Sequence, residues 1–360
     1  MKIAVVLGTR PEIIKFSPVI RECERLGLDF FVLHTGQHYS YNMDRVFFEQ
    51  LKVPGAKYNL DVGSGSHAKQ TGEMLVGVEK VLNKEKPDVV LVEGDTNTGL
   101  AGALAAAKLG IKVGHVEAGL RSYDRQMPEE INRVLADHCS DFLFAPTEKS
   151  AGILNHEGVP DEKVFVVGNT VVDAVFQNMD IAKSSKCDDL ETLGLEKGKY
   201  MVVTVHRQEN VDDKARFSGI IKGLRCVKKT FGTTLVYPVH PRARKQMKEF
   251  GLKSKSVCLV EPLDYLAFLR LESNARLVLT DSGGVQEESC ILKVPCVTLR
   301  DNTERPETVD VSANVLAGTD PDRIVDCVRL MLDRKNDWAN PFGDGKSAAR
   351  IIDVLRHKFD

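Results

Sequence analysis

The sequence lacks several features that mark well-known classes of protein. It has no apolar run near the ~20 residues that a membrane-spanning helix requires. Its formal net charge is −2, with no block of like charge that would suit nucleic acid or a lipid surface. The N-terminal MKIAVVLG enters a strand pattern directly and has no signal-peptide pattern. We therefore expect a cytoplasmic protein that binds neither nucleic acid nor membrane.

Cysteine patterns and cofactor motifs are also missing. None of the eight cysteines forms a C-x-x-C pair, and no Cys/His cluster has zinc spacing. Several cysteines lie in apolar runs such as 257–260, so buried, reduced thiols are expected rather than disulfides. No G-x-G-x-x-G follows the first strand, which argues against a nicotinamide cofactor. We expect no cofactor and no metal.

What is present is a repeated α/β pattern over 360 residues, a length that suggests about two domains. Apolar strand runs without alternation are separated by helical patterns, which predicts parallel sheets covered on both faces. The expected strands are 3–7, 30–34, 89–93, 113–117, 142–144, 164–167, 201–205, 234–238, 257–260, 277–280 and 296–299. The pattern restarts after residue 168, so we expect two doubly wound Rossmann-like domains, residues 1–170 and 171–360.

Ligands of open α/β sheets bind at the carboxyl ends of the strands, so the residues that follow each strand matter most. The first strand ends in GTRPE at residues 8–12, and a helix begins there. Arg10 and Lys15 then lie near a helix N-terminus, where main-chain N–H groups favour an anion. These residues alone leave two interpretations open. Arg10 and Lys15 could contact a phosphate, or they could be ordinary solvated basic side chains.

Three carboxyls follow strands or begin a helix in the first half. Asp95 could face the cleft or cap the next helix. Glu117 ends an apolar strand and could carry a perturbed pKa, or pair with Arg121 or Arg125. Glu129 could act chemically or simply favour the helix dipole. Together they suit proton transfer beside a phosphate; a divalent metal is the lesser alternative, because no Asp-x-Asp or His-Glu spacing supports it.

The second half carries a stronger local signal. A strand runs into Ser282, Gly283 and Gly284 and then into a helix, where backbone N–H groups and the hydroxyl can hold a diphosphate. Glu288, further along that helix, can accept hydrogen bonds from both ribose hydroxyls. His206 follows another strand and could meet a phosphate oxygen, relay a proton, or be purely structural.

These motifs resemble those of the non-hydrolysing UDP-N-acetylglucosamine 2-epimerases, in order, from near residue 1 to about 350. The motifs are GTRPEIIK (8–15), EGDTNT (93–98), GHVEAGLR (114–121), MPEEINR (127–133), GNTVVD (168–173), VHR (205–207), TDSGGVQEE (280–288) and RDNTERPE (300–307). The resemblance implies a glycosyltransferase-B type fold, with two domains facing a central cleft and the last helix packing back on the first domain. It also implies a homodimer that supplies sugars of the N-acetylmannosamine type to surface polysaccharide or glycan.

The implied activity is reversible epimerisation of UDP-GlcNAc to UDP-ManNAc at C2, by elimination and re-addition of UDP. The resemblance assigns Asp95, Glu117 and Glu129 to acid/base chemistry, with His206 beside the phosphates. It assigns substrate contacts to Arg10, Lys15, Phe268, Ser282, Gly283, Gly284, Glu288 and Arg305, with Phe268 beside uracil. The alternatives are a hydrolysing 2-epimerase that releases UDP and ManNAc, a retaining UDP-sugar glycosyltransferase, and a non-catalytic sensor of nucleotide sugars.

The chain departs from the family pattern at a few positions. Leu263 stands where some bacterial members place Gln, and Glu93 stands where bacterial members often have His. We expect Glu93 to add a carboxyl near Asp95 and to raise a neighbouring pKa. An allosteric site for a second UDP-GlcNAc is indicated only in part, by Gln37, His38 and His240.

Overall fold

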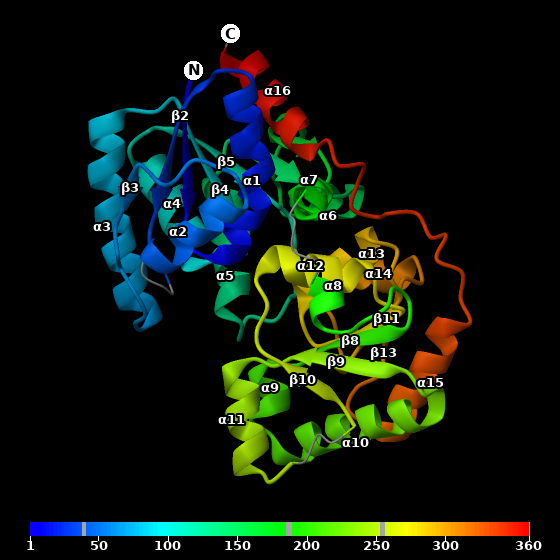
Figure 1. The fold of residues 1–360 in the computed structure, drawn as a ribbon. Coiled ribbons are helices and arrows are strands. Elements are labelled where there is room, and N and C mark those ends of the chain that lie inside the picture. Colours follow the sequence, from blue (N-terminus) through cyan, green and yellow to red (C-terminus); the bar gives the residue numbers. More distant parts are fainter. Residues whose placement is uncertain (38–40, 185–188, 253–255, 360) are drawn as a thin grey trace. The chain divides into compact units, whose positions relative to one another are not determined.

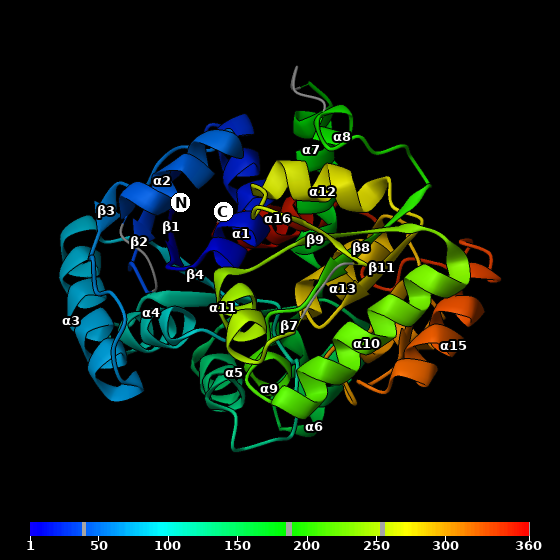
Figure 2. The ribbon, with the colours of Figure 1, turned by 60° about the horizontal axis from the view of Figure 1, so that its bottom comes forward.

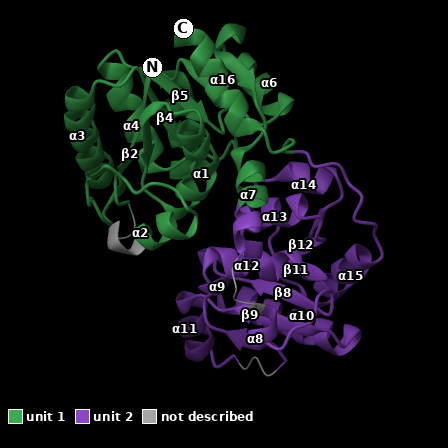
Figure 3. Cartoon of the chain, turned by 45° about the horizontal axis from the view of Figure 1, so that its top comes forward, with its two compact units in different colours: residues 1–177, 342–360 green, residues 178–341 purple. Residues whose placement is uncertain are grey.

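The chain forms two compact α/β units in a computed structural model, which describes residues 1–37, 41–184, 189–252 and 256–359. Unit 1 comprises Met1–Gln177 and Phe342–Asp360, and unit 2 comprises Asn178–Pro341 (Figure 3). The division falls within helix α7 (Thr170–Ser184), a few residues beyond the expected boundary at 170. The chain then returns to unit 1 for its last residues.

Unit 1 is built on a parallel sheet of seven strands in the order β3-β2-β1-β4-β5-β6-β7. The strands are β1 (Lys2–Leu7), β2 (Asp29–His34), β3 (Tyr58–Asn59), β4 (Val89–Glu93), β5 (Lys112–Val116), β6 (Phe142–Ala145) and β7 (Val164–Val166). The central strands are apolar along their length because helices cover both faces of the sheet, as Figures 1 and 2 show.

The helices of unit 1 follow the strands in a doubly wound arrangement. They are α1 (Arg10–Arg25), α2 (Tyr41–Gln50), α3 (His67–Glu85), α4 (Asn97–Lys108), α5 (Pro128–Cys139), α6 (Glu148–His156), the first part of α7, and α16 (Ser347–Phe359), with a 3₁₀ turn at Asp161–Lys163. The terminal helix α16 lies beside α1 (Figure 1). Its first main-chain N–H groups, at Ser347 and Ala348, donate to the carboxylate of Asp173 in α7 at 3.1 and 3.0 Å.

Unit 2 repeats the plan with a parallel sheet of six strands in the order β10-β9-β8-β11-β12-β13. The strands are β8 (Tyr200–Thr204), β9 (Thr234–Pro238), β10 (Cys258–Val260), β11 (Leu277–Thr280), β12 (Cys296–Thr298) and β13 (Asn314–Leu316). The helices are α8 (Asp189–Thr192), α9 (Gln208–Val211), α10 (Lys214–Phe231), α11 (Pro241–Glu249), α12 (Tyr265–Ser273), α13 (Gly283–Ile291), α14 (Pro306–Asp310) and α15 (Pro321–Leu332). Helices α10 and α15 lie side by side and cover one face (Figure 2).

The predicted doubly wound fold is confirmed, since every expected strand is present to within one residue at its start and at its end. The strands β3 and β13 were not expected, because segments of two and three residues are too short to show a periodic pattern. No helix of the described ranges is long and apolar enough to cross a membrane. The cysteines in those ranges are free thiols: Cys23, Cys139, Cys226, Cys258, Cys290, Cys296 and Cys327.

Both sheets reverse their strand order next to the first strand of the unit. The reversal lies between β1 and β4 in unit 1, and between β8 and β11 in unit 2. Doubly wound sheets bind ligands at the carboxyl ends of the strands at such a reversal. The residues after these four strands are therefore where each unit offers a site.

Candidate active site

In unit 1, a buried carboxyl joins the turn after β1 to the turn after β4. Glu12 accepts hydrogen bonds from the Gly8 main-chain N–H (2.9 Å) and the Thr9 hydroxyl (2.8 Å) on one oxygen, and from the Thr96 hydroxyl (2.6 Å) on the other. Burial raises the pKa of Glu12, and these hydrogen bonds oppose the rise. Glycine is required at position 8, because a Cβ there would overlap the Thr35 hydroxyl. The two turns thus form one connected surface at the strand reversal.

Lys15 holds two carboxyls at this surface. Its Nζ lies 3.0 Å from Oε1 of Glu93, the last residue of β4, and forms an ion pair with Oε2 of Glu117, which follows β5. All three side chains are largely buried, with 14% of Lys15, 3% of Glu93 and 4% of Glu117 exposed. Burial is the main reason that the pKa of Glu93 is raised well above its usual range; Glu117 adds to the rise and Lys15 opposes it.

Glu93 was expected to add a carboxyl near Asp95 and to raise a neighbouring pKa. The like-charge interaction that raises the pKa of Glu93 is with Glu117, while Asp95 pairs with Arg133.

The turn that carries Glu117 is held by a buried histidine and aspartate. Glu117 has φ +68°, in the left-handed region that residues with a Cβ seldom adopt. His115 lies 2.6 Å from Asp137 through Nδ1 and 2.9 Å from the Gly94 carbonyl through Nε2, so both ring nitrogens face acceptors. Asp137 also accepts from the main-chain N–H of Gly119 at 3.2 Å. This network fixes the ends of β4 and β5 relative to each other.

Charge pairing stabilises that network. Burial alone would lower the pKa of His115, but its pairing with Asp137 outweighs burial and raises that pKa. Burial alone would raise the pKa of Asp137, but His115 and Arg121 outweigh burial and lower it. Arg121 bonds Asp137 at 2.7 Å and Glu157 at 2.6 Å. The partner of Glu117 is therefore Lys15, and Arg121 is engaged elsewhere.

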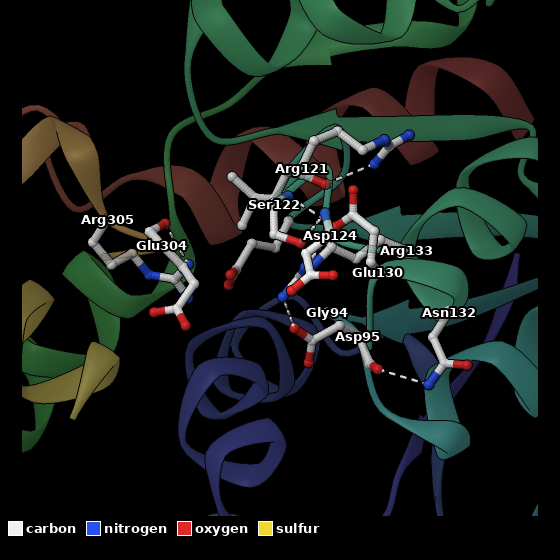
Figure 4. Close-up of polar contacts among 12 residues, drawn as sticks. Gly94, Asp95, Arg121, Ser122, Asp124, Glu130, Asn132, Arg133, Glu304 and Arg305 are labelled. Carbon is white, nitrogen blue, oxygen red and sulfur yellow. Dashed lines mark hydrogen bonds and ion pairs between the residues drawn. The ribbon is translucent and has the colours of Figure 1, made fainter. Parts of the chain in front are cut away.

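Asp95 is available for chemistry because it does not cap the following helix. The N-cap of α4 is Thr96, whose hydroxyl accepts from the Gly99 N–H at 3.0 Å. The Asp95 carboxylate forms an ion pair with Arg133 and remains 34% exposed. Its main-chain carbonyl accepts from the Asn132 amide at 2.9 Å, as Figure 4 shows. Helix α5 thus holds Asp95 by both its side chain and its main chain.

Glu129 and Glu130 have different environments in the first turn of α5. Glu129 is exposed, whereas Glu130 is buried. Glu130 accepts from the main-chain N–H groups of Ser122 (2.8 Å) and Tyr123 (2.9 Å) and bonds Arg133 at 2.8 Å (Figure 4). Burial alone would raise the pKa of Glu130, but these hydrogen bonds outweigh burial and lower the pKa. Glu130 therefore orders the loop before α5, and Glu129 is the carboxyl of the pair that solvent reaches.

The structure places Arg10 against α2. Its Nε lies 3.3 Å from Asp44, and its guanidinium stacks 5.4 Å from the centre of the Phe47 ring. Asp44 also lies 3.3 Å from the Nε2 of His34. A phosphate at Arg10 would share the guanidinium with Asp44.

The three residues of the expected allosteric site fall in different surroundings. Gln37 is buried, and its side-chain oxygen accepts from the main-chain N–H (3.1 Å) and hydroxyl (2.9 Å) of Thr98. His38 lies outside the described residues. His240 belongs to unit 2, where it caps α11 by accepting from the Arg242 N–H at 3.2 Å. The allosteric role of these residues stays a prediction.

In unit 2, the start of α13 has the form expected of an anion site. Ser282 is the N-cap, but its hydroxyl makes no capping hydrogen bond, so it is not consumed by the helix. A Cβ at Gly284 would meet nothing within 4 Å, and one at Gly283 would only approach Arg207 at 3.7 Å and Glu304 at 3.9 Å. Packing does not demand either glycine, which favours the interpretation that they leave room for a ligand.

His206 is oriented by a buried aspartate at the end of β11. Asp281 accepts from the main-chain N–H groups of His206 (3.0 Å) and Arg207 (3.0 Å), and from the Asn210 amide (3.2 Å). The Nδ1 of His206 lies 3.1 Å from the same carboxylate, and the side chain is 42% exposed. With Nδ1 facing Asp281, Nε2 is the nitrogen left to meet a ligand.

A cavity of about 200 Å³ lies beside His206 and Ser282, entirely within unit 2. It is lined by Thr204, Val205, His206, Pro238, His240, Pro262, Leu263, Phe268, Ser282 and Val285. The His206 and His240 rings lie 6.0 Å apart between centres, and burial, with His206 and Arg242, lowers the pKa of His240. The cavity therefore combines apolar and ring-bearing walls, suited to a base, with a serine and a histidine suited to phosphate.

Glu288 and Arg305 do not line this cavity. Glu288 lies in α13 and is 8% exposed; it interacts with the Tyr265 hydroxyl and with the buried Glu272. Arg305 is the N-cap of α14, and its Nε lies 2.7 Å from Glu287. Both residues are held by protein partners.

Sequence reasoning missed the residues that hold the others in place. His115, Asp137 and Arg133 orient the carboxyls of unit 1, and Asp281 orients His206. The resemblance motifs contain His115, Arg133 and Asp281, but nothing in their spacing distinguishes a supporting residue from a reacting one. Among the described residues, no group of three or more His, Cys, Asp or Glu side chains could hold a metal ion.

Comparison with known proteins agrees with this architecture. A family model described as UDP-N-acetylglucosamine 2-epimerase matches residues 21–356. The chain is 54% identical to the UDP-N-acetylglucosamine 2-epimerase of Methanocaldococcus jannaschii, with 99% of each chain covered. It is 55% identical to the enzyme of that name from Methanococcus maripaludis, with 98% of each covered.

A solved structure is also similar over the whole chain. It is the crystal structure of the Methanocaldococcus jannaschii UDP-GlcNAc 2-epimerase in complex with UDP-GlcNAc and UDP, with a TM-score of 0.90 and 54% identity. The similarity covers 99% of this chain and 100% of the other.

Proposed function

Because the chain belongs to the UDP-N-acetylglucosamine 2-epimerase family, we propose that it interconverts UDP-N-acetylglucosamine and UDP-N-acetylmannosamine by reversible epimerisation at C2 of the sugar. The observation that carries the proposal is the buried cluster of Lys15, Glu93 and Glu117 at the strand reversal of unit 1. Carboxyls held beside an ammonium in this way are suited to taking up and returning a proton.

Unit 2 binds the UDP portion in this proposal. The N–H groups at the start of α13 and the Ser282 hydroxyl hold the diphosphate, and His206 Nε2 meets a phosphate oxygen. Phe268, which lines the cavity, lies beside uracil. Glu288 of α13 accepts hydrogen bonds from the ribose hydroxyls. Arg305 adds positive charge for the phosphates, and Arg10 and Lys15 of unit 1 stay predicted substrate contacts.

Unit 1 supplies the acid/base carboxyls. The C2 proton has no neighbouring carbonyl to acidify it, so breaking the anomeric C–O bond comes first and leaves positive charge on the ring, as in glycoside hydrolysis. One carboxyl among Asp95, Glu117 and Glu129 removes the C2 proton, giving a glycal and UDP. Another returns a proton to the opposite face while UDP adds back to the anomeric carbon. Bound cationic groups and helix N–H groups stabilise the departing diphosphate.

Incubation with UDP-GlcNAc in deuterated water, followed by proton NMR, tests this scheme. The expected product is UDP-ManNAc that carries deuterium at C2, because the proton removed exchanges with solvent before one is returned. A product that keeps the original proton at C2 would exclude the scheme.

The same assay separates the alternatives. Steady accumulation of free UDP with ManNAc identifies a hydrolysing enzyme. Turnover only when a sugar acceptor is added identifies a glycosyltransferase, and binding without turnover identifies a sensor. The complete GTRPEIIK opening favours the non-hydrolysing reaction.

We also propose a cytoplasmic homodimer that supplies sugars for surface polysaccharide or glycan. The free thiols among the described cysteines support a reducing compartment. Light scattering of the purified protein tests the dimer; a monomer mass of 39.9 kDa across the working concentration range would exclude it.

A further inference from the structure

Glu93 and Glu117 lie at the ends of neighbouring parallel strands. In the register of β4 and β5, Glu93 pairs with Val116, so Glu117 is one residue further along. The main-chain N–H of Gly94 donates to the Val116 carbonyl at 3.1 Å, which fixes this alignment. Both carboxyls contact the single ammonium of Lys15, and Glu117 acts on Glu93 as a close group of like charge.

The charges of this cluster do not balance if both carboxyls are ionised. Two carboxylates and one ammonium leave one negative charge where Glu93 is 3% and Glu117 4% exposed. An uncompensated buried charge is unfavourable, and two close carboxyls relieve it by keeping one proton between them.

The other charged groups near the pair do not change this balance. Helix α1 contributes Lys15 and Glu12, and the turn after β5 contributes Glu117. His115 of β5 also acts on Glu117, but the buried Asp137 already pairs with this histidine. Glu12 accepts bonds from Gly8, Thr9 and Thr96, so its oxygens are engaged in holding the turns. If ionised, it adds negative charge, which further favours a proton on the Glu93–Glu117 pair.

We propose that Glu93 is a proton-sharing partner of Glu117, so that the pair holds one proton at rest and both residues set the proton affinity with which Glu117 acts. This inference rests on the proposed function, in which Glu117 is an acid/base carboxyl. When Glu117 removes the C2 proton the pair holds two protons, and it again holds one after a proton passes from the pair to solvent. Lys15 stays protonated throughout. Glu93 acts through Glu117 and is a positioning residue.

The test compares Glu93→Gln and Glu93→Asp with the wild type in the pH profile of kcat for UDP-GlcNAc epimerisation. In Glu93→Gln no second carboxyl acts on Glu117, so the limb of the profile at which the resting pair loses its shared proton moves to lower pH by about one unit or more. The optimum rate falls by less than the about hundredfold that loss of a general base costs. Glu93→Asp keeps a second carboxyl, and its limb stays within about half a unit of the wild type. A Glu93→Gln limb that superimposes on the wild type overturns the proposal.

Glu85→Gln is the matched control. Glu85 is also a carboxyl of unit 1 that pairs with a lysine, Lys2 at 2.6 Å, but it lies at the end of α3 and takes no part in the cluster. Its pH profile should coincide with that of the wild type. A shift as large as that of Glu93→Gln would show that removal of any carboxyl produces the effect, and would overturn the proposal.

Infrared difference spectroscopy gives a second readout that does not need activity. The wild-type minus Glu93→Gln spectrum at neutral pH should contain the carbonyl stretch of one protonated carboxyl, and its absence overturns the proposal. Should Glu93→Gln fail to fold, Glu93→Asp must shift this band, and an identical band in both proteins counts against the pair. If the wild type leaves UDP-GlcNAc unchanged, the proposed function is wrong, whereas the spectrum still reports the shared proton.

Discussion

Several carboxyls of this protein are buried and tuned by their neighbours rather than by solvent. Glu272 in α12 is fully buried; burial chiefly, and the nearby Glu288, raise its pKa well above the usual range. Glu85, in contrast, bonds Lys2, Lys57 and Tyr58, which lower its pKa to about 2. The two residues should therefore contribute to stability with opposite dependence on pH.

We predict that Glu272→Gln stabilises the protein at pH 8 and has little effect near pH 4. A folded pKa above the unfolded value means that the stabilising contribution of Glu272 is full below about pH 4.5 and is lost as pH rises through the folded pKa. Glutamine is neutral at every pH and keeps an oxygen for the Ser289 hydroxyl, which donates to Glu272 at 2.7 Å. Thermal unfolding measured at both pH values checks this.

Glu85→Gln serves as the contrasting variant. The pKa of Glu85 in the folded protein is depressed. The contribution of Glu85 to stability is therefore present above the unfolded pKa of about 4.5 and is lost as pH falls toward about 2. The substitution should lower the unfolding temperature at pH 8 and matter progressively less in acid. Equal effects of the two variants at pH 8 would contradict the assigned directions.

At the scale of elements, the starts of α4 and α13 show how a helix end can serve either packing or a ligand. The hydroxyl of Thr96 caps α4, while that of Ser282 leaves α13 uncapped. The open space at Gly284 contrasts with Gly223 in α10, where a Cβ would lie 2.6 Å from Cδ1 of Ile324. Packing therefore requires glycine at position 223 but not at position 284.

We predict that Gly284→Ala keeps or raises stability, by up to about 1 kcal/mol, because alanine is the better helix former. UDP affinity should fall at least about tenfold, or about 1.4 kcal/mol, because the methyl group occupies the space left for phosphate. Calorimetric titration with UDP and chemical denaturation measure the two effects.

Gly223→Ala provides the opposite pattern. Crowding against Ile324 should destabilise unit 2 by about 1–3 kcal/mol, while UDP affinity of the folded protein stays unchanged. Gly284→Ala binding UDP as tightly as the wild type would count against a phosphate site at the start of α13.

At the scale of the whole molecule, the chain enters unit 2 within α7 and returns to unit 1 at residue 342. The return is anchored within unit 1: Asp173 caps α16 through Ser347 and Ala348, and α16 packs beside α1. Unit 1 is therefore completed by the last residues of the chain, as the family resemblance implied for the last helix, whereas the expected boundary at residue 170 assigned them to the second domain.

We predict that Asp173→Ala loosens α16 by about 1 kcal/mol, the usual cost of losing a helix cap. Hydrogen exchange should show faster exchange in residues 347–359, while the helices of unit 2 exchange as in the wild type. Asp173→Asn keeps one acceptor oxygen, so exchange of residues 347–359 in this variant should be intermediate between the wild type and Asp173→Ala. Unchanged protection of α16 in Asp173→Ala would show that packing on α1 alone holds the helix.

The fold could be predicted because the strands at 89–93 and 277–280 are continuous apolar runs, and such runs report burial on both faces wherever they occur. The short strands β3 and β13 could not, since their pairing depends on neighbours distant in sequence. For the site, position after a strand identified Asp95, Glu117 and His206. It could not show that Thr96, and not Asp95, caps α4, because both residue types are good caps and the backbone decides between them.

The amino-acid sequence by itself determined which residues lie at the ends of parallel strands, because hydrophobic periodicity and glycine-rich turns are properties of residues that are neighbours in the sequence. Which side chains pair there was decided only by the tertiary structure. Strand register places the ends of β4 and β5 side by side, α1 brings Lys15 to both Glu93 and Glu117, and α5 brings Arg133 to Asp95. Burial and charge depend on segments far apart in the sequence, so no local pattern contains them.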